Sequence, residues 1–169
     1  MALKTNIQGM VHHYPDYFEV GREQVRAYAS AVKATDPASF NEKAAAELGH
    51  DGLVAPLTFP SIFAMLIQQD FFRTVDVGME TLQIVVVDQK FQYHRPIKPG
   101  DRLFGRMDIT SVDERFGADI VVTKSTCTNE NGEVVLEAST TLMGHEGDDS
   151  ISIKWDPESG QIMRKAAGE

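Results

Sequence analysis

The spacing of hydrophobic residues changes near Gly78. Before this point apolar residues recur every three or four positions, and after it they recur every second position. The first spacing is typical of amphipathic helices and the second of strands with one buried face. Helices followed by strands predict an α+β fold. No repeat or linker divides the chain, so we expect one domain over residues 1–146 and a separate acidic tail over 147–169.

Three helices are predicted in the first half of the chain. The first spans about Gly21 to Lys33, and the second spans Glu42 to Leu48, with Gly49 as a left-handed terminator. The third is a central helix within Leu53 to Phe71, and Thr58 would cap its amino end. Residues 53–69 carry no charge, but they contain two prolines and fall short of the roughly 18 apolar residues that a membrane span needs. Apolar residues surround nearly the whole central helix, which predicts that a sheet wraps around it and covers most sides.

Four long strands are predicted after Gly78. They run over Val85–Tyr93, Leu103–Thr110, Asp119–Thr128 and Val134–Leu142. In the first strand the residues expected on the buried face are Val85, Val87, Phe91 and Tyr93. Strands of this length are typical of a curved sheet. In the tail, Ile151, Ile153 and Trp155 alternate with polar residues, which predicts a small edge strand or docking arm, with a partner contact as the alternative.

Composition narrows the function. The chain of 169 residues carries 25 acidic against 16 basic side chains, a net charge of −9, which argues against nucleic-acid binding. The single cysteine, Cys127, excludes an internal disulfide and a cysteine zinc site and favours a reducing, cytoplasmic setting. Residues 1–10 lack the apolar run of a secretory signal. The histidines show no metal-binding spacing, so we expect no metal or other cofactor.

Several motifs together resemble one enzyme family. These are Tyr28–Pro37, Ala44–Gly49 leading to Val54–Thr58, and Phe91–Asp101, which ends in Arg-Pro-x-x-Pro-Gly-Asp. They resemble the MaoC-type (R)-specific hydratases and dehydratases, and this resemblance implies a single hot-dog fold. Stretches along nearly the whole chain are similar to the mycobacterial (3R)-hydroxyacyl-ACP dehydratases of mycolic acid synthesis, especially to their non-catalytic subunits.

Catalysis in the resembled family uses the motif Gly-Asp-x-Asn-Pro-x-His, whose Asp and His exchange protons with a 3-hydroxyacyl thioester. Alignment on Pro37 places Ala34 at the Asp position, Asp36 at the Asn position and Ser39 at the His position. The catalytic pair is therefore absent. The resemblance implies a silent subunit whose catalytic partner removes water to give a trans-2-enoyl thioester.

Other functions stay open at this point. The chain could instead pair with itself as an acyl-thioester or lipid-binding protein without catalysis. A hot-dog thioesterase would need a carboxylate in the central helix, and residues 53–69 contain none.

Two sets of residues are candidates for ligand contacts. Phe40, Phe59 and Phe63 are candidates for the wall of an acyl-chain tunnel, although core packing is the commoner role of such residues. Five basic residues form a candidate docking face for acyl carrier protein, with a solvated basic patch as the alternative: Lys90, Arg95, Lys98, Arg102 and Arg106.

Overall fold

The computed structural model describes residues 3–78, 82–115, 117–146, 151–156 and 161–166. Its helices are α1 (Arg22–Ala31), α2 (Glu42–Glu47) and α3 (Ser61–Thr74), with a 3-10 turn over Pro37–Ser39. Its strands are β1 (Val11–Glu19), β2 (Leu82–Tyr93), β3 (Arg102–Arg115), β4 (Ala118–Thr128), β5 (Val134–Glu146), β6 (Ile151–Asp156) and β7 (Gln161–Ala166).

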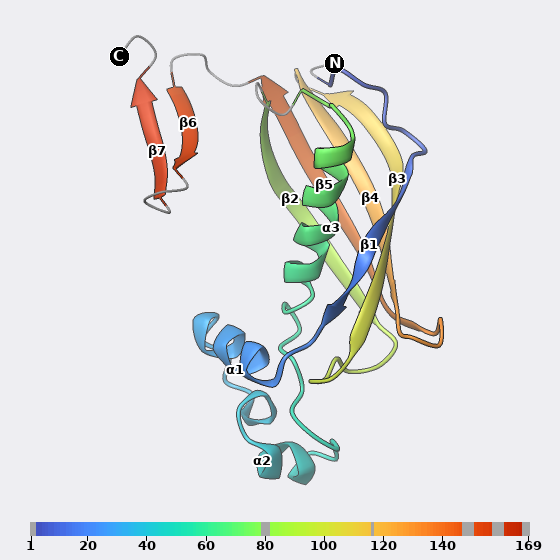
Figure 1. Ribbon diagram of the computed structural model, residues 1–169, viewed down its shortest axis with the longest axis vertical. Coiled ribbons are helices and arrows are strands. Elements are labelled where there is room, and N and C mark those ends of the chain that lie inside the picture. Colours follow the sequence, from blue (N-terminus) through green and yellow to red (C-terminus); the bar gives the residue numbers. More distant parts are fainter. Residues whose placement is uncertain (1–2, 79–81, 116, 147–150, 157–160, 167–169) are drawn as a thin grey trace.

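Five of the strands form one antiparallel sheet around α3. Their order is β1-β3-β4-β5-β2, so β1 and β2 are its edges. The sheet curves around α3, while α1 and α2 lie beyond the amino end of that helix (Figure 1). The arrangement confirms the predicted α+β fold with a long curved sheet and a central helix.

Helix α3 comes close to the backbone of β3 at Gly105. A Cβ atom added to Gly105 would lie 2.4 Å from Ile67 Cδ1 and 2.8 Å from Phe63 Cζ, so only glycine allows this approach. Phe63 is 1% exposed, and Phe18 of β1 stacks on its ring at 5.2 Å between centroids. The core therefore lies between α3 and the sheet, with buried residues from β1, β3, β4 and β5.

Strand β1 is missing from the elements that the sequence predicts. Pro15 interrupts its alternation, and its register with β3 shifts between His13 and Tyr17. The strand pairs with β3, about ninety positions further along the chain, at Val11 to Asp108 and Glu19 to Arg102. Its partner, rather than its own pattern, stabilises it.

The predicted buried face of β2 is wrong at its beginning. A bulge lies between Val86 and Asp88, so Val86, opposite the buried Leu142, shares a face with Phe91, opposite the buried Ala138, whereas Val85 lies on the other face. Val85, Val86 and Val87 are 45% to 56% exposed. An extra residue at a bulge inverts the alternation, and a strict period of two cannot anticipate this.

The predicted cap of α3 is also different. The helix begins at Ser61, and the Thr58 side chain does not cap it. Instead the Thr58 carbonyl accepts hydrogen bonds from Ser61 N at 3.1 Å and from Ser61 Oγ at 2.7 Å.

The end of the chain forms a second, separate sheet. Strand β6 pairs antiparallel with β7, and these two strands make up that sheet. Ile151–Asp156 is thus a strand, but it is not an edge of the five-stranded sheet.

Candidate functional site

A pocket of about 700 Å³ lies where the loop after α1 meets the segment before α3. Its lining comes from both segments: Tyr28, Val32, Ala34, Thr35, Asp36 and Ser39 on one side, and Val54, Ala55, Pro56, Leu57 and Thr58 on the other. More of this lining is apolar than polar. The structure therefore brings Ala34 and Ser39, which the sequence alignment assigns to the family's catalytic positions, into the wall of one pocket.

The polar side chains at these positions form hydrogen bonds with backbone groups. Ser39 is 2% exposed, and its Oγ donates to the Val54 carbonyl at 2.8 Å. Asp36 Oδ1 accepts from the Ala38 amide at 2.9 Å and so caps the 3-10 turn. Ala34 has no group that can exchange a proton. These residues of the pocket wall therefore provide no free acid–base pair.

Two tyrosines fix the pocket segment that precedes α3. Tyr28 Oη donates to the Thr58 carbonyl at 2.8 Å, and Tyr93 Oη donates to the Leu57 carbonyl. Burial and the nearby Tyr28 raise the pKa of Tyr93, so its hydroxyl stays protonated as a donor. Sequence reasoning did not identify either tyrosine as part of this site.

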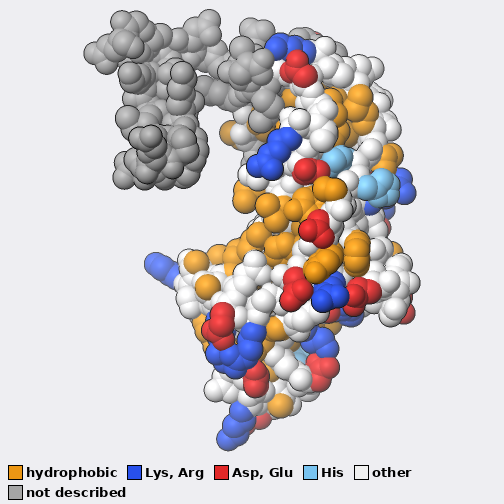
Figure 2. Space-filling model, in the orientation of Figure 1, with side chains coloured by type: hydrophobic (Ala, Val, Ile, Leu, Met, Phe, Trp, Pro, Cys, Tyr) orange, Lys and Arg blue, Asp and Glu red, His pale blue; other side chains and the backbone are white. Residues whose placement is uncertain are grey.

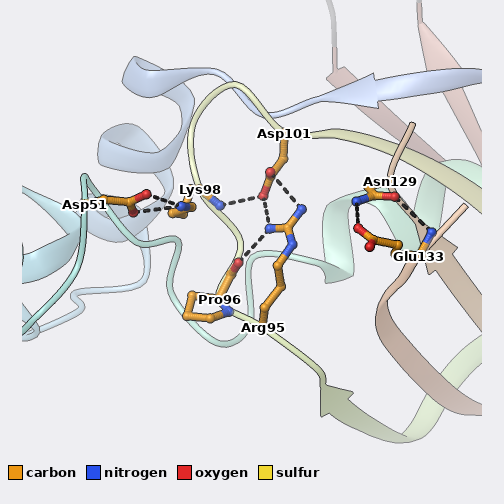
Figure 3. Close-up of polar contacts among 7 residues, drawn as sticks. All are labelled: Asp51, Arg95, Pro96, Lys98, Asp101, Asn129 and Glu133. Carbon is orange, nitrogen blue, oxygen red and sulfur yellow. Dashed lines mark hydrogen bonds and ion pairs between the residues drawn. The ribbon is translucent and has the colours of Figure 1, made fainter. Parts of the chain in front are cut away.

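The Arg-Pro-x-x-Pro-Gly-Asp motif supports the pocket from outside (Figure 3). Arg95 makes two hydrogen bonds to the Asp101 carboxylate, at 2.7 and 2.9 Å, and Asp101 also accepts from Lys98 N at 2.9 Å. This closed loop presents the Ile97 carbonyl to the Ala55 amide at 2.8 Å. The motif therefore fixes one wall of the pocket through backbone hydrogen bonds.

The same loop is joined to the segment after α2. Lys98 Nζ lies 2.7 Å from both carboxylate oxygens of Asp51 (Figure 3). The Lys98 ammonium lowers the pKa of the Asp51 carboxyl, chiefly through these hydrogen bonds. Asp51 thus connects the two loops.

The three candidate phenylalanines lie outside the pocket wall. Phe59 and Phe63 are 0% and 1% exposed and belong to the aromatic core, where Tyr28 packs edge-on against Phe59. Phe40 ends the 3-10 turn and is half-buried. Their contact with an acyl chain stays a prediction, and the pocket wall consists of other residues.

The five candidate docking residues come from two strands and the loop that joins them. Arg95 and Lys98 lie in the loop between β2 and β3, whereas Lys90, Arg102 and Arg106 lie on the two strands. Four of the five are ion-paired: Arg95 with Asp101, Lys98 with Asp51, Arg102 with Glu19 and Glu130, and Arg106 with Asp108. These carboxylates offset much of the positive charge, and carrier docking at this set stays a prediction.

The carboxyl-terminal half of helix α3 contains one carboxylate, that of Asp70. The helix continues past residue 69 and includes Asp70, whose Oδ2 lies 2.9 Å from His12 Nε2. This pair joins α3 to β1 near the opposite end of the helix from the pocket. It is therefore part of the packing between α3 and the sheet edge.

One face of α3 is left uncovered by the sheet. Met65 is 52% exposed, and Ile62 and Leu66 beside it are only partly buried. Figure 2 shows hydrophobic side chains across the middle of the molecule, over α3. The sequence predicts that a sheet covers most of this helix, but within the described chain it covers one side.

No described helix is long and apolar enough to cross a membrane.

A sheet wrapped around one helix, with a pocket at the amino end of that helix, defines a hot-dog protein of the MaoC type. The chain belongs to the FAS1-like dehydratase family, because residues 7–138 match the family model described as "FAS1-like, dehydratase domain region". Both the fold class and the family resemblance seen in the sequence are confirmed.

Individual relatives agree with this assignment. The chain is 65% identical to UPF0336 protein Rv0637 of Mycobacterium tuberculosis, over 98% of this chain and 100% of that protein. It is similar to a chain of the C terminal truncated HadBC (3R-hydroxyacyl-ACP dehydratase) complex from Mycobacterium tuberculosis, with 63% identity, a TM-score of 0.78, and coverage of 83% of this chain and 99% of that one. A MaoC-like dehydratase is 35% identical with a TM-score of 0.76, and the match covers 96% of this chain and 52% of that protein.

Proposed function

We propose that this chain is the non-catalytic, acyl-accommodating subunit of a heterodimeric (3R)-hydroxyacyl-ACP dehydratase of fatty acid elongation, within mycolic acid synthesis. Its partner supplies the Asp and His that eliminate water to give the trans-2-enoyl thioester. The observation that carries this proposal is the pocket wall, where Ala34 and the hydrogen-bonded Ser39 occupy the family's catalytic positions.

The chemistry of the pocket supports a silent role. A serine hydroxyl is a poor proton acceptor near neutral pH, and Ser39 already donates its proton to the Val54 carbonyl. Asp36 is the carboxylate of the pocket wall, and its Oδ1 caps the 3-10 turn. Removal of the C2 proton and protonation of the leaving hydroxyl therefore need groups from another subunit.

The apolar surface supports a paired assembly. The open face of α3 is exposed, and three exposed valines lie on β2, the edge strand at the opposite end of the sheet from β1. An edge strand with exposed apolar residues is a template for a second sheet. A hot-dog partner placed there would cover Met65 and extend the sheet through β2. The HadBC structure, one chain of which is similar to this chain, is described as a complex.

The pocket supports a role in holding the acyl chain. With its mainly apolar wall it offers space for the hydrocarbon part of a substrate, because such chains bind in apolar cavities. The catalytic partner would hold the thioester and the reacting carbons. The subunit without catalytic groups would thus determine how long a chain the complex accepts.

The test is a hydration assay with trans-2-enoyl thioesters of increasing chain length. We expect no activity from this chain alone. Mixed with a hot-dog subunit that carries the intact Gly-Asp-x-Asn-Pro-x-His motif, the complex should be active, and replacing the partner's His with Ala should abolish that activity. The Asp36→Asn variant of this chain should leave the rate within about twofold, because Asn also caps turns. Activity of this chain alone that Asp36→Asn abolishes would overturn the proposal.

A self-paired binding protein is the alternative that the same apolar edge permits, since a second copy could also cover it. The two functions differ in what the assay measures. A chain that binds acyl thioesters as a homodimer, and gains no activity when mixed with the catalytic subunit, would favour the alternative.

A further inference from the structure

The wall of the pocket between the loop after α1 and the segment before α3 differs in exposure from one part to another. Leu57 and Val32 are exposed and so lie at its rim, whereas Ser39 and Ala55 are buried. Most side chains of this wall are small, and Tyr28 is the largest of them. The position of the Tyr28 ring therefore has a large effect on the shape of the pocket.

Tyr28 separates this pocket from the aromatic core. It lines the pocket and is half-buried, and its ring packs edge-on against Phe59, with 5.4 Å between the centroids. Phe59 is fully buried and is not part of the pocket wall. Phe18 lies 6.1 Å from Phe59, and Phe63 lies 5.2 Å from Phe18, between ring centroids. At Tyr28 the pocket thus ends at a ring, and a row of core rings continues behind it.

The Tyr28 side chain is held in place from two directions. Its Oη donates to the Thr58 carbonyl at 2.8 Å and lies 3.4 Å from Ser61 Oγ. On α1 itself, Val25 and Ala29 are fully buried, so the helix that carries Tyr28 is packed against the rest of the chain. The ring therefore cannot swing out of the pocket wall without breaking a hydrogen bond.

Shortening this side chain would deepen the pocket. Protein interiors are close-packed, so a truncated side chain leaves a space that its surroundings fill only in part. At position 28 the space would open into the pocket, because Tyr28 already forms part of the wall, and the Phe59 ring would line it. Apolar spaces of this kind bind apolar ligands.

We propose that Tyr28 is the floor of this pocket and sets the longest acyl chain that the dehydratase complex accepts. This inference rests on the proposed function, in which the pocket holds the hydrocarbon part of the substrate. The last methyl group of the longest accepted chain would meet the Tyr28 ring. Phe59 and Phe63, the tunnel candidates from the sequence, would then lie behind the floor, and an acyl chain would reach Phe59 only after Tyr28 is shortened.

The experiment measures kcat/KM of the heterodimer for trans-2-enoyl thioesters of increasing chain length. The limit is the length beyond which kcat/KM of the natural heterodimer falls, and a short thioester is the internal reference. For a thioester just beyond the limit, Tyr28→Ala should raise kcat/KM relative to that reference at least about tenfold, because one methylene group in an apolar pocket changes kcat/KM by roughly 10–200-fold. Tyr28→Leu, which keeps an apolar contact with Phe59, should give a smaller rise in the same direction.

Two further variants separate the size of the side chain from its other roles. Tyr28→Phe removes only the hydroxyl and should keep the natural limit. A limit that moves in Tyr28→Phe would assign the effect to the hydrogen bond with Thr58 and overturn the floor. Tyr17→Ala removes an exposed tyrosine of β1 that lies outside this pocket, and it should leave the limit where it is.

The outcomes distinguish this inference from the proposed function. Ala34→Leu tests the latter, since a larger side chain in the pocket wall should shorten the limit whether or not Tyr28 is the floor. If Ala34→Leu shortens the limit but Tyr28→Ala and Tyr28→Leu leave it unchanged, the floor is wrong and the proposed function stands. If none of these variants moves the limit, or no active heterodimer forms, both proposals fall.

Discussion

The two sides of helix α3 are built differently. Toward β1 and β3 the helix has Phe63, 1% exposed, and the close approach at Gly105. On its open face Met65 is 52% exposed, and the edge strand β2 has three exposed valines. On the closed side the side chains pack as tightly as in a protein interior. The open side is as apolar as a protein interior, but no part of the described chain covers it. Folding of the chain thus depends on one side, and we propose that assembly depends on the other.

The largest expected effect is a difference in stability between two variants of α3, one on its closed side and one on its open face. Phe63→Ala should lower the free energy of unfolding by about 3–5 kcal/mol, because it leaves a cavity where Phe18 and Tyr14 pack on the ring. Met65→Ala, two residues away, should change it by less than about 0.5 kcal/mol in the isolated chain. Urea denaturation of both variants measures this difference. Equal losses would show that the open face is part of the fold's own core.

The second prediction concerns the open side alone. Val86→Lys should leave the unfolding of the isolated chain unchanged but weaken association with the catalytic subunit about 100-fold, because the interface would bury an unpaired charge. Val134→Lys is the matched control, since Val134 is also exposed, at 41%, but begins β5 beside the Asn131-Gly132 turn. Analytical ultracentrifugation measures both affinities. Equal weakening by the two variants would place the interface elsewhere.

A smaller loss of stability is expected at Gly105, where β3 and α3 come close together. Gly105→Ala should destabilise the chain by about 1–3 kcal/mol, because the new methyl group overlaps Ile67 and Phe63. Gly52→Ala meets no atom within 4 Å and serves as the control. Thermal unfolding compares the two. An unchanged midpoint for Gly105→Ala would mean that α3 is free to move away from β3.

The smallest effect belongs to the outer face of the sheet, where Lys124 and His94 contact Glu137 at 2.8 and 3.1 Å. These partners, Lys124 first, lower the pKa of Glu137 below its usual value of 4.5. A carboxyl with a lowered pKa in the folded state stabilises the fold above its unfolded pKa. That contribution is lost as pH falls through the lower folded value.

Glu137→Gln should therefore slightly reduce stability at pH 7 and flatten its fall below about pH 4.5. Glu47→Gln, at an exposed position of α2, is the control. Urea denaturation across pH 3–7 measures both. A variant that keeps the full acid dependence of the natural chain would assign that dependence to other carboxyls.

Much of the fold can be predicted from the sequence because its pattern is local. Gly49, predicted as a left-handed helix terminator, adopts a positive φ of 85°, and the central helix and the long strands follow their periodicities. Strand β1 and the bulge of β2 could not be predicted, because both depend on pairing with distant strands.

The site divides in the same way. The absence of Asp and His at positions 34 and 39 can be read directly, given the family motif. The use of the Ser39 hydroxyl on Val54, and of Tyr93 on Leu57, requires the three-dimensional structure, since each contact joins distant segments. The open face of α3 is a property of the assembly. A sequence pattern shows that such a helix needs cover, but it does not show which chain provides it.

Native mass spectrometry of this chain, alone and mixed with a subunit carrying the intact catalytic motif, tests the central claim most directly. The account predicts a one-to-one heterodimer in the mixture, and its loss when Val86 is replaced by Lys. A mixture in which the two chains stay separate would contradict the account.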